Sequence, residues 1–357
     1  MRIFIGTQEI CGLISLYAKE LKRLGHTVTT FTYEKNRYYK NAEYDIVFSD
    51  NQLLYKSKFS LINRIVYKLN RTIKSIRIFF LVKKIAKQND AVIYIWNSLQ
   101  ETNRDIEYFK RKGKKIIFLF VGSDVRHFNT FSKSYDVTQW KFPDYMTADG
   151  KEKYLQYIQQ AETYGDLIYS VPDQAGLQSK PYYHLQIPIE TPVINFKNNK
   201  RKKPKVLHLP SDPWKKGTDI IEATVDELIE EGVCIDFISM RDISNIETLD
   251  LLQDIDILVD EIVFHGPGVL AFEAMASGCA VATRYLVNSP DCFRPPLVNI
   301  NAYNIKVELR RLFTDYDLQQ ELIINGRKYV EENNNSLTVV KNMINNLNNP
   351  RAYDYCV

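Results

Sequence analysis

Short apolar runs alternate along the first half of the chain with longer segments in which apolar residues recur at helical spacing. The runs predict buried strands at residues 2–5, 28–31, 45–48, 91–95 and 115–120. Residues 13–24 have the apolar spacing of an amphipathic helix, and Gly25 follows where a C-cap glycine belongs. Strands that alternate with helices favour a parallel α/β sheet.

A second α/β pattern follows a polar stretch, residues 196–205, which we interpret as a solvated interdomain linker rather than a nucleic-acid site. Beyond it the pattern predicts strands at 206–209, 234–240 and 255–259, and helices at 218–231 and 337–347. Thr218 is a predicted N-cap, and Ser244 with Glu247 is a predicted capping box. These elements predict a second α/β fold of the same kind.

The division of the chain follows from these patterns. We predict an amino-terminal domain over 1–195 and a second domain over 206–335, with the carboxy-terminal helix, 336–357, packing back on the first domain. The length of 357 residues is sufficient for two cores. The composition, 45% apolar and 25% charged, is that of a globular protein.

The sequence also predicts where the protein resides. The opening residues lack the basic start and long apolar core of a secretory signal. The five cysteines are scattered without a C-x-x-C pair, as is common in a reducing compartment. We therefore expect a cytoplasmic protein.

The net charge is +4, but one stretch concentrates it. Residues 51–89 contain ten Lys or Arg and no Asp or Glu, and their apolar positions predict a basic amphipathic helix over 62–87. Such a helix either contacts an anionic surface, which would place the protein on the inner face of the membrane or beside an anionic acceptor, or packs on a core with a solvated basic face. Aromatic residues suited to nucleic acid are sparse, so no nucleic-acid partner is expected.

The strongest chemical pattern lies between residues 265 and 283. Gly266 and Gly268 allow a ligand to approach the backbone, and Pro267 is suited to begin a helix. The free N–H groups of that helix's first turn favour a phosphate, and Glu273 could accept hydrogen bonds from ribose hydroxyls. The alternative is a tight turn before a helix with a solvent-facing glutamate.

This stretch resembles the donor-site motif of glycosyltransferase family 4, a family of retaining enzymes with the GT-B fold. The matching residues are Gly266, Gly268, Glu273, Ala274, Met275, Ala276, Gly278 and Val281. The resemblance implies two Rossmann-like domains that face each other across a cleft. It implies that Glu273 binds the donor ribose and that residues 266–270 contact its diphosphate, with backbone donors at Gly268, Val269 and Leu270. One position departs from the motif, because His265 replaces a glutamate that contacts the transferred sugar.

A second matching segment precedes it. Lys216 and Gly217 resemble the family's loop in which a lysine opens the nucleotide domain, so Lys216 is expected to place a cation on the diphosphate. Many members carry an arginine six residues earlier, where this chain has Pro210. Arg241 is the candidate second cation, unless it is an ordinary surface arginine.

The amino-terminal half has weaker matches. Gly12 is expected near the donor phosphates, and residues 121–126 resemble a Gly-Ser-Asp-x-Arg segment of the family. Asp124 would orient the acceptor hydroxyl and Arg126 would bind an anionic group of the acceptor; alternatively, the two form a helix cap with an internal salt bridge. Lys216, His265 and Asp124 are the predicted catalytic residues. His127 and His208 are interpreted as structural.

The resemblance implies transfer of a hexose, with retention, from a nucleoside-diphosphate sugar to a saccharide or lipid-linked acceptor, in the synthesis of a surface polysaccharide or glycolipid. It implies no metal and no cofactor beyond the donor. The leaving phosphate would itself help deprotonate the acceptor hydroxyl. Two alternatives stay open: a nucleotide-sugar epimerase of the same fold, and a non-catalytic binding protein.

Overall fold

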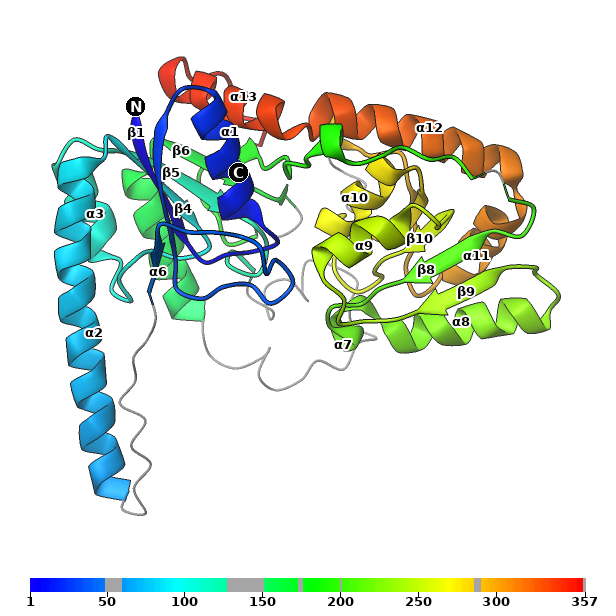
Figure 1. The fold of residues 1–357 in the computed structure, drawn as a ribbon, viewed down its shortest axis with the longest axis horizontal. Helices are drawn as coiled ribbons and strands as arrows, with labels where there is room; N and C mark the ends of the chain where they lie inside the picture. The colour runs from blue at the N-terminus through cyan, green and yellow to red at the C-terminus, as the bar shows by residue number, and fades with distance from the viewer. Residues whose placement is uncertain (49–59, 127–150, 173–175, 200, 286–289, 356–357) are drawn as a thin grey trace.

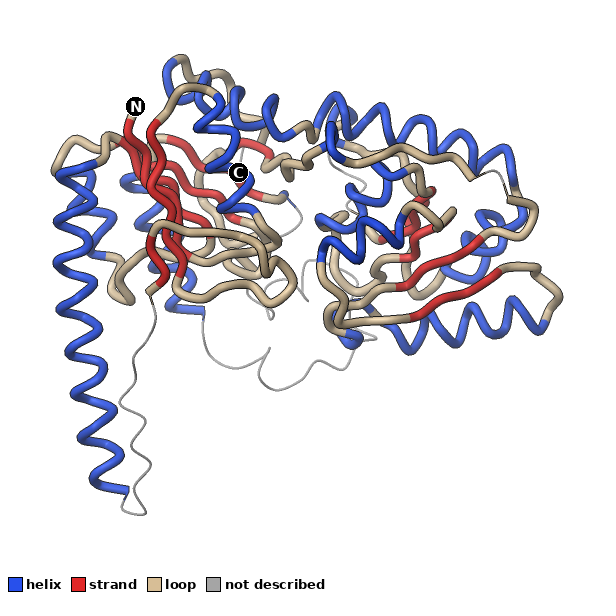
Figure 2. Tube along the Cα trace, viewed as in Figure 1, coloured by secondary structure: helices blue, strands red, loops and turns tan. Residues whose placement is uncertain are grey.

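The computed structural model describes residues 1–48, 60–126, 151–172, 176–199, 201–285 and 290–355. The chain forms two α/β units, each built on its own parallel sheet (Figures 1 and 2). His127 and Cys356 lie outside the described residues.

The first sheet has seven parallel strands in the order β3-β2-β1-β4-β5-β6-β7, which extends the Rossmann order by one strand. Its strands are β1 Arg2–Thr7, β2 Thr27–Thr32, β3 Ile46–Val47, β4 Ala91–Ile95, β5 Lys115–Phe120, β6 Leu167–Ser170 and β7 Tyr183–His184. Its helices are α1 Leu13–Arg23, α2 Ser60–Gln88, α3 Arg104–Arg111 and α6 Lys151–Tyr164. The strands predicted at 91–95 and 115–120 are confirmed at both ends, whereas the strand predicted at 45–48 is only two residues long.

Alternate residues of these strands point to opposite faces of the sheet, and each face has its own core. On β1, Phe4 packs with residues of α2, α3 and α6, whereas Ile3 and Ile5 pack with α1. The near-continuous apolar runs in the sequence reflect this burial on both faces.

The second sheet has five parallel strands in the order β12-β11-β10-β8-β9. Its strands are β8 Lys205–His208, β9 Asp236–Ser239, β10 Ile257–Val259, β11 Ala280–Thr283 and β12 Val298–Asn299. Its helices are α7 Pro213–Lys216, α8 Thr218–Glu230, α9 Asn245–Leu252, α10 Val269–Ser277, α11 Ile305–Thr314 and α12 Tyr316–Asn333, with short 3₁₀ turns η2 Thr191–Val193 and η3 Asp291–Phe293. The core on one face includes residues of α8 and α11, and the core on the other includes residues of α10.

The helix caps test two sequence predictions. The capping box of Ser244 and Glu247 is confirmed at the start of α9. The N-cap predicted at Thr218 is wrong: Gly217 occupies that position, and the Thr218 hydroxyl is 2.8 Å from Nε2 of His208. His208 is therefore structural, because its Nδ1 also lies 2.8 Å from the carbonyl of Val259.

The last helix, α13 Ser336–Asn348, follows α12 along one edge of the molecule and returns to the first sheet (Figure 1). Val340 and Met343 share a core with α1, and the Ser336 hydroxyl donates to Glu20 over 3.0 Å. The chain end continues along the first domain, where Tyr182 and Tyr355 form an antiparallel bridge. The boundaries at 195 and 206 stay predictions.

Candidate active site

In the second sheet the chain adds β9 on one side of β8 and adds β10, β11 and β12 on the other, so the direction of the strand order reverses between β8 and β10. The helices that follow these two strands, α8 and α10, accordingly pack on opposite faces of the sheet. Ligands of open α/β sheets bind at such a point, outside the carboxyl ends of the strands. Two segments begin there, the loop from β8 into α7 and the loop from β10 into α10. These segments carry most of the residues predicted for donor binding.

Lys216 ends the short helix α7, which Asp212 caps. Its Nζ lies 2.8 Å from Oδ1 of Asp260 and 3.0 Å from Oε2 of Glu261, and all three side chains are largely buried. Burial alone would lower the pKa of Lys216, but the two carboxylates hold it above its ordinary value. The predicted cation is therefore present, and it is already balanced by two acidic residues.

Sequence reasoning missed Asp260 and Glu261. Burial raises the pKa of Glu261 to about 7, against the opposing effect of Lys216. Among the described residues, Oδ2 of Asp260 is buried without a hydrogen-bond partner. Both residues directly follow β10, and polar residues at the carboxyl end of a predicted buried strand were the signal that could have found them.

The glycine-rich loop ahead of α10 is fixed to the neighbouring strand end. The amide of Gly266 donates to the carbonyl of Arg284, and the amide of Arg284 donates to the carbonyl of Glu261, over 2.9 and 2.8 Å. The Arg284 guanidinium donates to the carbonyl of Ile262 over 3.2 Å. Arg284 is thus a supporting residue that the motif did not indicate, and it holds the loop in place.

The helix after this loop begins at Val269, two residues later than the predicted start at Pro267. Gly268 is its N-cap, with no side-chain cap, and a Cβ added there would meet nothing within 4 Å. The first-turn amides, which include those of Val269 and Leu270, have no partner within the helix. Amides without a partner at the start of a helix suit an anion.

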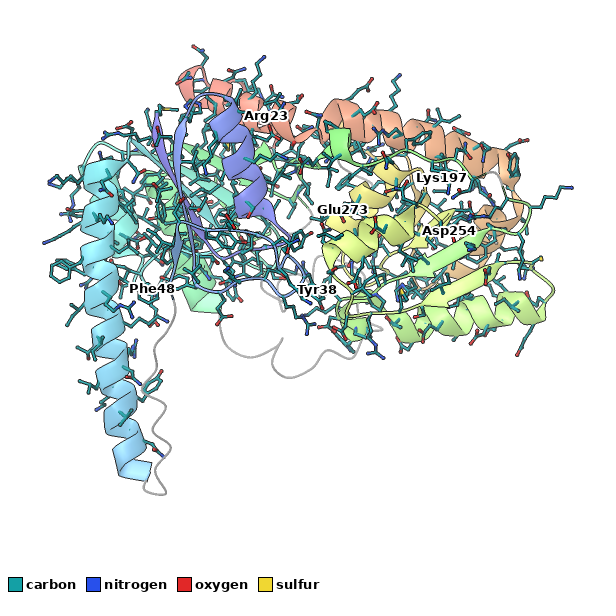
Figure 3. The ribbon with its side chains drawn as sticks, in the orientation of Figure 1. Arg23, Tyr38, Phe48, Lys197, Asp254 and Glu273 are labelled. Carbon is teal, nitrogen blue, oxygen red and sulfur yellow. The ribbon has the colours of Figure 1, made fainter. Side chains whose placement is uncertain are left out.

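Glu273 lies further along α10 and is buried, so the alternative of a solvent-facing glutamate is wrong. Its Oε1 accepts a hydrogen bond of 2.9 Å from the side-chain amide of Asn245, the first residue of α9. Burial raises the pKa of Glu273 to about 7, and the bond from Asn245 opposes that shift. Figure 3 shows Glu273 on the side of the second domain that faces the first.

His265 is buried beside the same loop. Burial, and then the positive charges of Arg284 and Arg126, lower the pKa of its imidazole to about 3. The ring is therefore neutral at physiological pH. It can donate one hydrogen bond and accept another, whereas the glutamate of the family motif can only accept.

The first domain brings its own glycine to this site. Gly12 precedes α1 with a φ of 75°, and a Cβ there would lie 2.7 Å from the ring of Tyr39. Desolvation, and then the negative charge of Glu273, raise the pKa of the adjacent Cys11 to about 11, whereas Lys216 acts to lower it. The Gly12 loop is thus within electrostatic reach of both residues of the second domain.

A nearby segment of the first domain contacts the second directly. The carbonyl of Tyr38 accepts from the amide of Asn245 over 3.0 Å. Figure 3 shows Tyr38 at the edge of the first domain on that side. Asn245 therefore joins the two domains and holds Glu273.

Arg126, which was predicted to bind an anionic group of the acceptor, places its guanidinium against the second domain. Its Cζ is 3.9 Å from the centroid of the Phe264 ring, in the loop that precedes α10. Its charge also lowers the pKa of Glu261, after larger effects of burial and Lys216. Arg241 is exposed just beyond β9, and no hydrogen bond or ion pair of the described residues joins it to Lys216 or Glu273.

Asp124 is buried in the turn after β5. Its carboxylate accepts from the amides of Val121 and Gly122 over 3.1 and 2.8 Å, and burial raises its pKa to about 7. These bonds are of the capping kind that the alternative interpretation expected. Asp124 nevertheless borders a cavity.

That cavity, of about 580 Å³, lies at the carboxyl ends of β2, β4 and β5 in the first domain. Its described lining is aromatic, amide and charged: Tyr33, Arg71, Lys74, Ser75, Ile78, Trp96, Asn97, Ser98, Leu99, Gln100, Glu101, Thr102, Asn103, Asp124, Tyr154 and Tyr157. Asp105 holds its rim, since it accepts from the amide of Leu99 over 2.9 Å. Of this lining only Asp124 was predicted as a site residue, because the walls come from five separate segments of the chain.

No group of three or more His, Cys, Asp or Glu side chains in the described part of the chain is arranged to hold a metal. Two Asp-x-Asp pairs occur in the sequence. Asp254 and Asp256 form ion pairs with Arg201, and Asp315 caps α12. Both pairs thus have structural partners.

No protein-family model and no curated protein matches the sequence. Solved structures do match, over nearly the whole chain. Sucrose-phosphate synthase from Thermosynechococcus elongatus has a TM-score of 0.65 at 12% identity, covering 97% of this chain and 98% of that one.

Two further structures are similar. A glycosyltransferase from Rickettsia africae has a TM-score of 0.60 at 11% identity, covering 98% of each chain. A protein from Listeria monocytogenes assigned as a UDP-N-acetylglucosamine 2-epimerase has a TM-score of 0.58 at 11% identity, covering 100% of each chain. At such identities the similarity shows the fold, which is the GT-B fold predicted from the sequence, two Rossmann-like domains facing each other across a cleft.

Proposed function

We propose that this protein is a glycosyltransferase that moves a hexose from a nucleoside-diphosphate sugar to a saccharide or lipid-linked acceptor, in the synthesis of a surface polysaccharide or glycolipid. One observation carries the proposal. Lys216, the glycine-rich loop and buried Glu273 meet at the switch point of the second sheet, within electrostatic reach of the first domain's Gly12 loop. A cation, free helix amides and a carboxylate suit a diphosphate joined to a ribose.

Donor binding is divided among these groups. Glu273 accepts hydrogen bonds from the ribose, and the amides of Gly268, Val269 and Leu270 receive the diphosphate. Lys216 stabilises the negative charge that grows on the leaving diphosphate. Arg126 supplies the second cation that the family places at the position of Pro210, since it lies on Phe264 beside the same loop. Neutral His265 hydrogen-bonds the transferred sugar.

The acceptor occupies the cavity of the first domain. Aromatic rings such as Tyr33 and Trp96 offer faces to a sugar, and Asn97 and Asn103 offer amide groups to its hydroxyls. Asp124, whose carboxylate borders the cavity, orients the attacking hydroxyl.

The reaction proceeds with retention and without a metal. The bond between the anomeric carbon and the leaving phosphate oxygen breaks, and the acceptor oxygen bonds to the same face of that carbon. The proton of the acceptor hydroxyl passes to the leaving phosphate. The protein then contributes positioning and stabilisation of charge, which do not require a nucleophilic side chain.

A nucleotide-sugar epimerase is the second candidate, favoured by Glu261. A buried carboxyl whose pKa is near 7 has the property of a general acid or base. The similarity to the Listeria protein is consistent with that chemistry. The acceptor-sized cavity in the first domain favours transfer, since an epimerase needs no acceptor.

The variant Lys216→Ala tests the proposal, and Lys215→Ala is its control. Lys215 is the neighbouring lysine, and it forms an ion pair with Asp212 at the surface. The donor is the UDP-, GDP- or ADP-hexose that binds the parent most tightly, and acceptor-dependent release of nucleoside diphosphate is measured with saccharide and lipid-extract acceptors. We expect Lys216→Ala to lower turnover about 10²-fold, as for other preorganised groups at a developing anion, and Lys215→Ala to stay close to the parent. Equal effects of both variants would remove Lys216 from the site. Epimerisation of the sugar on its nucleotide, in the absence of any acceptor, would establish that the protein is an epimerase.

A further inference from the structure

Helix α2, Ser60–Gln88, extends well beyond the body of the first domain (Figure 1). Its carboxyl-terminal half is anchored, because Ile78, Val82 and Ile85 are buried in the core beneath the sheet. Among the described side chains of residues 63–77, none is buried. Within the described residues, no helix is both long and apolar enough to cross a bilayer.

One face of this helix is apolar and exposed. Leu69, Ile73, Ile76 and Phe80 have exposed fractions of 51%, 44%, 52% and 63%. At about 100° per residue these four positions fall within an arc of roughly 60°. Large apolar side chains gathered on one exposed face mark an interaction surface, whereas single exposed ones do not.

The opposite face of α2 has another role. Arg71, Lys74 and Ile78 line the cavity of the first domain, and they lie roughly 180° around the helix from the apolar face. The basic residues of the helix are therefore divided between its faces, since Arg71 and Lys74 line the cavity.

Charge defines the partner of the apolar face. Residues 60–88 contain eight Lys or Arg and no acidic residue. Lys83, Lys84 and Lys87 are exposed and continue the apolar face toward the anchored end of the helix. A second copy of this chain would place like charges against one another. An anionic lipid surface offers both an apolar interior and negative headgroups.

We propose that α2 binds the protein to an anionic membrane surface. Leu69, Ile73, Ile76 and Phe80 enter the boundary between headgroups and acyl chains, and Lys83, Lys84 and Lys87 contact the headgroups. Arg71 and Lys74 face away from the lipid, so membrane binding leaves the cavity open. The proposal does not depend on the chemistry assigned to that cavity.

Co-sedimentation of the full chain with lipid vesicles tests it. We expect the parent to bind vesicles of phosphatidylcholine with 30% phosphatidylglycerol, to bind pure phosphatidylcholine weakly, and to lose binding as salt rises. Ile76→Ser combined with Phe80→Ser should weaken binding roughly tenfold or more, and so should Lys83→Gln combined with Lys84→Gln. Thermal unfolding is measured for each variant, and these exposed changes should leave it close to the parent.

Arg71→Gln combined with Lys74→Gln is the matched control, because it removes two charges from the opposite face of the same helix. Its vesicle binding should stay within about twofold of the parent. A control that weakens binding as much as Lys83→Gln with Lys84→Gln would overturn the orientation. Indifference to lipid charge, or a solution dimer that the Ile76 and Phe80 changes dissociate, would overturn the membrane as the partner.

Discussion

Lys216 carries a charge that Asp260 and Glu261 already balance. A diphosphate that reaches Lys216 must therefore compete with Glu261 or share the lysine with it. Burial raises the pKa of Glu261, so this carboxylate takes up a proton more readily than an exposed glutamate does. Arg126, contributed by the facing domain, adds a positive charge that the second domain lacks at Pro210.

Glu273 should make the stability of the unliganded protein depend on pH. Burial raises its pKa from 4.5 to about 7, so between those values the folded chain retains a proton that the unfolded chain has lost. Its contribution is present below about pH 4.5 and is lost as the pH rises to about 7. Glu273→Gln abolishes this titration. We expect the variant to unfold at the parent's temperature at pH 5 and to be more stable at pH 8, by on the order of 1–3 kcal/mol.

Differential scanning fluorimetry at pH 5 to 8 measures this difference. Other buried carboxyls titrate equally in parent and variant, so the difference between the two isolates Glu273. Glu332→Gln, on the exposed side of α12, controls for the loss of one negative charge. Parallel curves for parent and Glu273→Gln would show that Glu273 is ionised in the folded protein.

The site residues that could be predicted from the sequence are those that lie in a local sequence pattern. Glu273 and Lys216 follow glycine-marked segments, and the structure places both at one switch point. The motif marked Arg126 but could not show its contact with Phe264, and no spacing along the chain could reveal that Asn245 contacts Glu273, because both contacts are tertiary.

Helix α10 has a glycine at each end, and the two have different physical roles. Gly268 has φ −82° and open space around it, whereas Gly278 has φ 97° and a Cβ there would lie 2.3 Å from the carbonyl of Lys197. Gly278→Ala should therefore destabilise the fold by at least about 1–2 kcal/mol. Gly268→Ala should change stability by less than about 0.5 kcal/mol but place a methyl group where the diphosphate approaches.

Thermal unfolding and nucleotide titration of Gly268→Ala and Gly278→Ala check these two predictions. Gly268→Ala is expected to bind the nucleoside diphosphate roughly tenfold more weakly, as for the loss of a hydrogen bond to a charged group. Unchanged affinity in Gly268→Ala would place the diphosphate elsewhere.

Among the elements, buried strands were predictable and exposed surfaces were not. The continuous apolar runs of β4 and β5 are required by burial on both sheet faces. In α2 the same helical spacing of apolar residues predicted a helix, but it could not show that Leu69 and Phe80 are exposed. Thr218 looked like a cap because its hydroxyl can bond locally, but His208 takes that hydroxyl instead.

At the scale of the whole molecule, the candidate site belongs to both domains. Tyr38 bonds Asn245 across the interface, Arg37 forms an ion pair of 3.2 Å with Asp242, and Arg126 lies on Phe264. The sequence predicted two sheets because their strands repeat one pattern. It could not predict how the domains face each other, since these contacts are single residues in loops.

The central claim is that the second domain binds a nucleoside diphosphate through Glu273 and the α10 amides. Isothermal titration of the parent and of Glu273→Ala with UDP, GDP and ADP tests it most directly. The account predicts that the parent binds at least one of the three and that Glu273→Ala binds it at least about tenfold more weakly, since the ribose loses its hydrogen bonds to the Glu273 carboxyl group. A parent that binds none of them, or a variant that binds as tightly as the parent, would contradict it.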